Sequence, residues 1–365
     1  MNGERLSRVR AAAADADLDA VLVTPGADLR YLTGYKALPL ERLTCLVVPA
    51  DAAPILVVPT LERPAAEAST VGGLGIQMLD WPETEDPVGL VAKLLPGARR
   101  IAVDDHMWAE KVLRFRAAMP DAEQVLAGPV LRELRMRKSA DEVSALREAA
   151  AAIDRVHARI GEWLRAWRTE REVGRDIADA MLAEGHAGVD FVIVASGSNG
   201  ASPHHENSDR AIEPGDPVVV DIGGTTVAGY CSDETRTYAV GTPPDEFVRA
   251  YEVLQRAQAA AVEHVRPGVT VESVDAAARD VLTEAGLGEY FVHRTGHGIG
   301  LETHEEPYIV AGSTRVLEPG MAFSIEPGFY LPGSYGARIE DIVVTTSEGV
   351  ERLNLQPRDL VVLQP

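Results

Sequence analysis

The sequence predicts a small α/β domain followed by a larger α+β domain. In the first 127 residues, short apolar stretches alternate with helical stretches, which is typical of an α/β fold. From residue 128 onward, long helices and β-rich segments follow one another. The chain has 365 residues, of which 46% are hydrophobic, and this is enough for two domains with substantial cores. We therefore expect domains at residues 1–127 and 128–365.

Four apolar runs in the first domain are expected to form strands of a mostly buried sheet. They read "LDAVLVT", "TCLVVPA", "APILVVPT" and "RIAVDD". Residues 86–95 and 106–119 are expected to be helical. The polar residues of this domain form no obvious catalytic cluster, so the chemistry is expected in the second domain.

Two capping boxes mark the first helices of the second domain. The pairs are Ser139 with Glu142 and Thr169 with Glu172. The first pair is expected to begin an alanine-rich helix that reaches about Arg168, and the second a helix that ends near Gly185. Two further helices are expected over residues 245–265 and 271–285.

An internal repeat lies in the second domain. The stretches "EPGDPVVVDIG" and "EPGMAFSIEPG" align without a gap at an offset of 105 residues. Each has a turn, an apolar strand and then a carboxylate, which is Asp221 in one and Glu326 in the other. Downstream, Asp233 and Glu340 each open another strand. Turns of this kind are common before strands, but acids on both strands of both stretches favour two related halves, each a hairpin.

These four acids indicate a metal site. A buried carboxylate is costly unless it has a strong partner or a metal. Four carboxylates and an imidazole could bind two divalent cations, whose charge would balance theirs. An oxygen-rich site with one nitrogen suits Mn²⁺, with Co²⁺, Zn²⁺ and Fe²⁺ as competitors. Two such ions activate water at neutral pH, so the implied reaction is metal-assisted hydrolysis.

Three of the nine histidines fall in "HRTGHGIGLETH". A three-histidine metal cluster is one interpretation of this stretch. Its glycines argue against a helix, so we expect a strand or a loop. A nucleotide-binding loop is disfavoured because the stretch has neither a G-x-G-x-x-G fingerprint nor a G-K-[ST] loop.

Four segments of the second domain carry a family resemblance. They are "DIGG…GYCSDETRTY", "GHGIGLETHEEP", "SIEPGFY" and "ARIEDIVV". Together they resemble the signature segments of the pita-bread-fold metallopeptidases, which include methionine aminopeptidase, aminopeptidase P, prolidase and creatinase. "ADLRYLTGY" near the N-terminus resembles the amino-terminal domain of the prolidase and aminopeptidase P branch. The resemblance implies an α+β pita-bread catalytic domain preceded by a creatinase N-terminal-like domain.

The resemblance also implies roles for individual residues. The five dimetal ligands would be Asp221, Asp233, His297, Glu326 and Glu340. Asp233 and Glu340 would bridge the two ions, and Glu326 could also take a proton from the nucleophile and pass it to the leaving nitrogen. The other catalytic residues would be His204 for proton shuttling or substrate contact, His304 for the oxyanion and Arg338 for orienting the bridging ligand. The substrate pocket would include His293, Phe191, Tyr330 and Tyr308.

The activity that follows from the resemblance is hydrolysis of Xaa-Pro peptides. Such bonds need a dedicated enzyme because proline lacks an N–H group and its ring fixes the backbone. Tyr308 stands where prolidases often carry an arginine that grips the carboxylate of a dipeptide. The compact length favours a dipeptidase as the first expectation, and the absence of this arginine favours an aminopeptidase acting on longer peptides as the second. Creatinase-type hydrolysis and a non-catalytic binding module are disfavoured because the ligand set is complete.

Composition and charge limit the partners and the setting. The net charge is −21, from 35 Lys and Arg against 56 Asp and Glu, which disfavours nucleic acid as a partner. Two cysteines suggest no disulfide framework, and no apolar run approaches a membrane span. The N-terminus is polar and lacks a signal core, so we expect a cytoplasmic protein. The family resemblance implies a homodimer.

Overall fold

The structure is a computed structural model that describes residues 2–365 and divides into two compact units. The first unit ends at Arg135 and the second begins at Met136. The boundary expected from the sequence, between residues 127 and 128, lies earlier, at the start of helix α6 (Gly128–Met136). Most of α6 remains with the first unit, where Arg135 donates to Asp28 at 2.8 Å.

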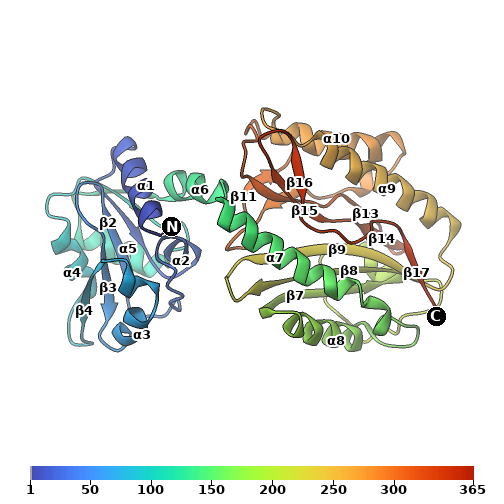
Figure 1. Cartoon of the computed structure of the whole chain (residues 1–365), viewed down its shortest axis with the longest axis horizontal. Coiled ribbons are helices and arrows are strands. Elements are labelled where there is room, and N and C mark those ends of the chain that lie inside the picture. Colours follow the sequence, from blue (N-terminus) through green and yellow to red (C-terminus); the bar gives the residue numbers. More distant parts are fainter. Residues whose placement is uncertain (1) are drawn as a thin grey trace. The chain divides into compact units, whose positions relative to one another are not determined.

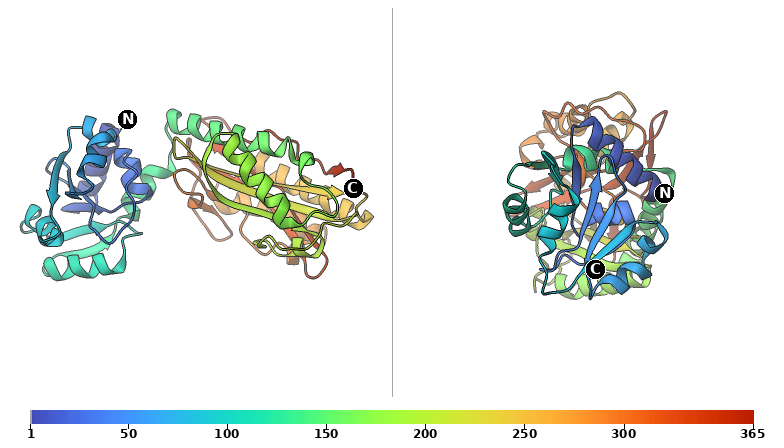
Figure 2. Two further views of the ribbon diagram at one scale, coloured as in Figure 1. Left: turned by 90° about the horizontal axis from the view of Figure 1, so that it is seen from below. Right: turned by 90° about the vertical axis from the view of Figure 1, so that its left-hand side faces the viewer.

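The first unit is a six-stranded mixed sheet in the order β4-β3-β2-β1-β5-β6, with helices on both sides (Figure 2). The strands are β1 (Ala20–Val23), β2 (Cys45–Pro49), β3 (Ile55–Pro59), β4 (Gln77–Trp81), β5 (Arg100–Val103) and β6 (Glu123–Leu126). The helices are α1 (Asn2–Asp15), α2 (Ala27–Thr33), α3 (Arg63–Ala68), α4 (Pro87–Leu94) and α5 (Ala109–Ala118). The four predicted strands are β1, β2, β3 and β5, and the two predicted helices are α4 and α5. This unit has the α/β class that the sequence predicted.

The second unit contains three sheets, in the orders β17-β9-β8-β7, β11-β10-β12-β15-β16 and β13-β14. Strands of the first sheet are β7 (His186–Ser196), β8 (Pro217–Thr226), β9 (Cys231–Val240) and β17 (Val361–Leu363). Those of the second are β10 (Gly296–Gly298), β11 (Glu305–Ile309), β12 (Ala322–Ile325), β15 (Asp341–Thr345) and β16 (Val350–Arg352). The third is the hairpin of β13 (Gly328–Leu331) and β14 (Tyr335–Arg338). The antiparallel pair β8–β9 is a hairpin, as the sequence repeat predicted, whereas β12 and β15 pair antiparallel but are separated in the chain by the hairpin β13–β14.

Four long helices cover the sheets of the second unit (Figure 1). They are α7 (Ala140–His157), α8 (Glu170–Ala183), α9 (Asp245–His264) and α10 (Val271–Glu284). Val220 of β8 shares an apolar core with Ile177 of α8, and Phe323 of β12 shares another with Leu254 of α9. The helices therefore cover one face of each sheet and leave the other for the residues between the sheets. None of the helices in the described part of the chain is long and apolar enough to cross a membrane.

Both predicted capping boxes are formed, at Ser139 and at Thr169. The prediction that the first helix reaches Arg168 was wrong, because α7 ends at His157. A 3₁₀ turn at Ile160–Glu162 follows, and Trp167 adopts a positive φ of 70°. These irregular residues bring the chain to the start of α8, which an uninterrupted helix could not do.

Candidate metal centre

The alternation of β8 and β9 places two carboxylates on one face of the four-stranded sheet. Val220 and Ile222 of β8 pack toward α7 and α8, so Asp221 between them points to the opposite face. Asp221 pairs with Thr235 of β9, and Asp233 lies two residues from Thr235. Asp233 therefore shares the face of Asp221.

The pair β12–β15 supplies two more carboxylates at the end where β13 and β14 connect the two strands. Glu326 directly follows β12 and Glu340 directly precedes β15. Ile325 pairs with Asp341, so the two glutamates occupy the next position along the antiparallel pair. Asp341 accepts a hydrogen bond from Gln258 of α9, which places Asp341 on the helix-covered face and Glu340 on the other.

His297 is held on β10 by close backbone packing. A Cβ atom on Gly296 would lie 1.8 Å from the carbonyl oxygen of Ser324, so only glycine fits there. His297 Nδ1 lies 3.1 Å from the carbonyl oxygen of Gly298, to which it can donate. Its Nε2 then carries the lone pair and faces Glu326 Oε1 at 3.3 Å. The glycine-rich segment is thus a strand at His297, as expected, and it continues as a loop.

Burial and mutual repulsion dominate the electrostatics of the four acids. Burial raises the pKa of Asp233 and of Glu340 well above their ordinary values, and the neighbouring carboxylates raise both further. Burial also raises the pKa of Glu326 to about 7, and it lowers the pKa of His297 to about 3. The site therefore favours neutral side chains unless cations balance the carboxylates.

The donor atoms fit divalent cations. Asp233, His297 and Glu340 each offer one ligand atom, and these atoms lie within 4.8 Å of one another. Asp221 Oδ1 and Glu340 Oε1 are buried and accept no hydrogen bond from the described residues. Buried oxygen atoms of this kind need a partner, and a hard or borderline cation supplies one. Four carboxylates and one imidazole form the oxygen-rich donor set that the sequence predicted.

A cavity of about 890 Å³ opens over these ligands. Asp221, Asp233, His297, Glu326 and Glu340 all line it, together with Asp190, Phe191, Ile193, Pro203, His204, His293, Arg294, Thr303, His304 and Arg338. Every residue predicted for metal binding or catalysis thus faces one space. Of the four residues predicted for the substrate pocket, Phe191 and His293 line the cavity, whereas Tyr308 and Tyr330 are not among the described residues that do so.

Two parts of the chain match known families. Residues 144–347 match metallopeptidase family M24, and residues 5–137 match the creatinase/prolidase N-terminal domain. The chain belongs to metallopeptidase family M24. It is therefore a metallopeptidase with the pita-bread fold expected from the sequence, and membership of the family implies the use of divalent metal.

Relatives of this M24 peptidase match it over nearly the whole chain. The probable dipeptidase PepE of Mycobacterium tuberculosis is 57% identical over 98% of this chain and 96% of its own. The Xaa-Pro dipeptidase of Lactobacillus helveticus is 37% identical over 96% of each chain. The crystal structure of the Thermococcus sibiricus prolidase, 37% identical, covers 100% of this chain and 99% of its own with a TM-score of 0.93.

Arg338 of the M24 peptidase forms hydrogen bonds with several residues of the site. Its guanidinium lies 2.5 Å from Asp221 Oδ2, and it donates to the Tyr330 hydroxyl at 2.6 Å and to Thr235 Oγ1 at 3.1 Å. The Thr235 hydroxyl in turn donates to Glu340 Oε2 at 2.8 Å. Tyr330 also bonds to His293 Nε2 at 2.9 Å, so it supports the wall of the cavity. Thr235 was not predicted from the sequence, although it stands two residues after Asp233 on the same strand face.

Arg294 is the second residue of the site that was not predicted from the sequence. It lines the cavity, and its guanidinium lies 4.3 Å from the ring centroid of Tyr308. Burial lowers the pKa of His304, and the positive charge of Arg294 lowers it further. The ring of His304 lies 4.0 Å from that of His297. The only signal for Arg294 in the sequence was its place in "HRTGH", beside His293.

Proposed function

We propose that this M24 peptidase is an Xaa-Pro dipeptidase that uses two divalent ions, with Mn²⁺ as the first candidate and Co²⁺, Zn²⁺ and Fe²⁺ as competitors. The observation that carries the proposal is the presence of Arg294 in the same cavity as the five candidate ligands. A guanidinium at this place can bind the free carboxylate of a dipeptide. Relatives with the printed names dipeptidase and Xaa-Pro dipeptidase support the same class of substrate.

The candidate ligands would hold the ions, which supply Lewis acidity and a lowered pKa for water when bound. Glu326 lines the cavity and would accept a proton from the attacking water and return it to the leaving nitrogen. His304 lies on the cavity wall beside His297 and would donate a hydrogen bond to the developing oxyanion. His204 on the same wall would contact the substrate or relay protons. Arg338 fixes the orientation of Asp221.

The cavity wall also offers a place for the proline ring. Phe191 and His293 line the cavity, and His293 is fixed by its bond to the buried hydroxyl of Tyr330. A shaped and partly apolar wall can select the proline ring itself. A peptidase that binds its substrate as an extended strand would instead need the N–H group that proline lacks.

A second candidate function is an Xaa-Pro aminopeptidase that acts on longer peptides. It is favoured by Tyr308, which stands in the place of the carboxylate-binding arginine that the sequence analysis expected in prolidases. The two candidates differ in what the enzyme recognises after proline. A dipeptidase needs a carboxylate there, and an aminopeptidase needs a continuing chain.

The proposed function is tested with three substrates in parallel at saturating Mn²⁺. We expect hydrolysis of Ala-Pro, slow or no hydrolysis of Ala-Pro-Ala, and none of Ala-Ala. Preference for the tripeptide would establish the aminopeptidase instead. Failure to cleave either proline peptide, with metal confirmed bound by elemental analysis, would exclude both candidates.

Replacing Arg294 with methionine is expected to lower kcat/KM for Ala-Pro by about 10- to 100-fold, the value of one charge-assisted hydrogen bond to a carboxylate. Hydrolysis of Ala-Pro amide, which has no carboxylate, should change little. The exposed Arg266, which is outside the cavity lining, provides the control variant Arg266→Met. An equal loss on Ala-Pro and on its amide would contradict the role of Arg294 in carboxylate binding.

A further inference from the structure

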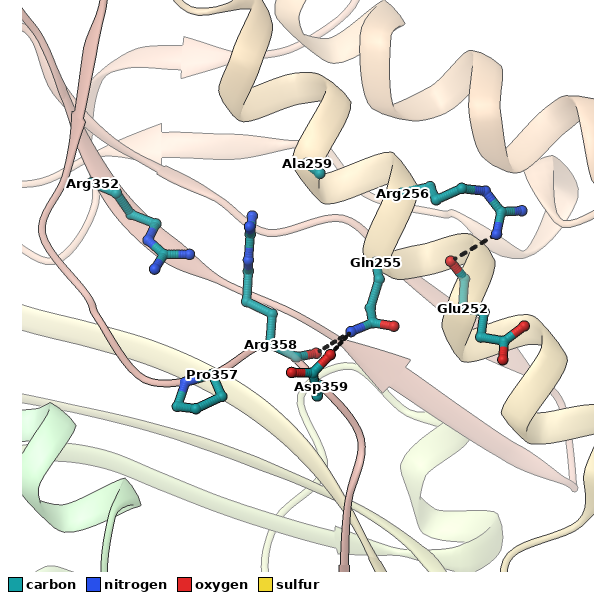
Figure 3. Close-up of a pocket in the computed structure, with 8 residues that line it drawn as sticks. All are labelled: Glu252, Gln255, Arg256, Ala259, Arg352, Pro357, Arg358 and Asp359. Carbon is teal, nitrogen blue, oxygen red and sulfur yellow. Dashed lines mark hydrogen bonds between the residues drawn. The ribbon is translucent and has the colours of Figure 1, made fainter.

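A second polar cavity lies in the catalytic unit, between α9 and the chain segment that follows β15 (Figure 3). Its volume is about 580 Å³. The residues that line it are Glu252, Gln255, Arg256, Ala259, Arg352, Pro357, Arg358 and Asp359. None of them lines the cavity over the metal ligands. Three arginines thus line one cavity, although the whole chain has a net charge of −21.

Two of these arginines act as a pair. In Figure 3 the guanidinium groups of Arg352 and Arg358 extend to the same side of α9, whereas that of Arg256 extends to the other side. Both line the same cavity, so their like charges repel; burial lowers the pKa of Arg358, the charge of Asp341 raises it, and the charge of Arg352 lowers it. Such a pair is stabilised when an anion binds between the two charges.

The two guanidinium groups keep donors available for a ligand. Arg358 donates from Nη1 to Gln258 Oε1 at 2.5 Å, and Arg352 Nη1 lies 3.6 Å from Asp341 Oδ2, beyond hydrogen-bond distance. The described residues accept no other hydrogen bond from these two guanidinium groups. Each guanidinium has five N–H donors, so most of them remain free to bind an oxyanion.

Among the described residues, neither acid of the cavity forms an ion pair with Arg352 or Arg358. Asp359 accepts a hydrogen bond from Gln255 Nε2 at 3.0 Å. Glu252 is exposed, and in Figure 3 its carboxylate lies on the side of α9 away from Arg352 and Arg358. The negative charge that partly balances the pair comes instead from the buried Asp341 beneath it.

We propose that Arg352 and Arg358 form a binding site for a small doubly charged oxyanion of the sulfate or phosphoryl type. Two forked guanidinium groups match the several oxygen atoms of a tetrahedral dianion. The cavity has room for such a group and for a small organic part attached to it.

The site is linked to the metal centre through Asp341. Arg352 lies 3.6 Å from this carboxylate, and Arg358 is connected to it through Gln258, which donates to Asp341 Oδ2 at 2.9 Å. Arg236 donates to Asp341 Oδ1 at 2.7 Å and to the carbonyl oxygen of Glu340 at 2.5 Å. An anion that draws Arg352 away from Asp341 would therefore alter the surroundings of a candidate metal ligand, which makes the site an effector site.

Calorimetric titration of the Mn²⁺-loaded chain with sodium sulfate tests the proposal. Sulfate is the probe because it binds metals weakly, and sodium chloride holds the ionic strength constant. We expect saturable binding by the wild type and binding at least about tenfold weaker in Arg352→Gln, since a charge-assisted hydrogen bond is lost. Arg256→Gln is the matched control and should bind as the wild type does. Inorganic phosphate and methyl phosphate, titrated in the same way, distinguish a free ion from a phosphoryl group on an organic molecule.

Two results would overturn the proposal. Equal sulfate binding by the wild type and by Arg352→Gln would exclude the arginine pair, and so would the absence of saturable binding in the wild type. Arg352→Gln is the decisive variant because its side chain makes no hydrogen bond that the fold would lose. The link is tested by the Mn²⁺ dissociation constant, which should depend on sulfate in the wild type and not in Arg352→Gln. The same dependence in both would refute the link.

Discussion

Replacing Asp233 with asparagine is expected to lower the Mn²⁺-dependent turnover of Ala-Pro by more than about 100-fold, since even changes around a metal ligand cost 10- to 100-fold. Asp233 is buried, and its ligand atom lies within 4.8 Å of those of His297 and Glu340. An amide in its place keeps the shape but removes a negative charge that the cations require. The measurement is turnover as a function of Mn²⁺ concentration.

The fold should survive this change. In the metal-free protein burial and the charges of Glu340, Asp221 and Glu326 all raise the pKa of Asp233, so its carboxylate is unfavourable there. We therefore expect Asp233→Asn to unfold in urea at a denaturant concentration at least as high as the wild type when no metal is present. Asp190→Asn is the matched control, because this exposed residue lines the same cavity and accepts a bond from Thr225. Wild-type turnover by Asp233→Asn at moderate Mn²⁺ would disprove the assignment.

Much of the fold followed from local patterns in the sequence. Capping boxes at Ser139 and Thr169 located the starts of α7 and α8 because side-chain caps act within one helical turn. The end of α7 did not follow, since most of residues 158–168, "ARIGEWLRAWR", are good helix formers and only Gly161 among them is a poor one. At the end of the helix the ring of His157 bonds to the hydroxyl of Tyr238 at 2.8 Å and lies 3.2 Å from the carbonyl oxygen of Glu234, and these contacts with β9 could not be predicted from local sequence.

The candidate site was predictable where strand alternation and the internal repeat agreed. Acids on apolar strands could be recognised in the sequence, and alternation then placed them between the sheets. Arg294 and Thr235 were not predictable in this way, because their roles depend on neighbours far along the chain. Thr235 donates to Glu340 of the other strand pair, and Arg294, which precedes β10, lies over the ring of Tyr308 in β11. Likewise Tyr330 was expected in the pocket, but its hydroxyl is engaged by Arg338 and His293.

In the metal-free protein, replacing Glu326 with glutamine is expected to raise the free energy of unfolding by about 3 kcal/mol at pH 8 and by very little at pH 4.5. Burial raises the pKa of Glu326 from 4.5 to about 7 in the folded protein. A raised pKa gives stability that is complete below the unfolded value and is lost as pH rises through the folded value. Glutamine resembles the protonated acid at every pH, so the advantage of the variant should grow between pH 4.5 and 7. Urea unfolding in the presence of a chelator measures it.

Comparison of the two proteins at each pH is essential, because buried histidines titrate in the same range with the opposite effect. Burial lowers the pKa of His157 to about 3 and of His293 to about 4, so both add stability as pH rises toward 6.5. These contributions cancel in the difference between Glu326→Gln and the wild type. Glu284→Gln, an exposed change on α10, should show no such growth with pH. With saturating Mn²⁺ the wild type should be more stable than Glu326→Gln, because the ions stabilise the Glu326 carboxylate and glutamine binds them poorly. A difference in the free energy of unfolding that stays constant from pH 4.5 to 8 would show that the pKa of Glu326 is not raised in the metal-free folded protein.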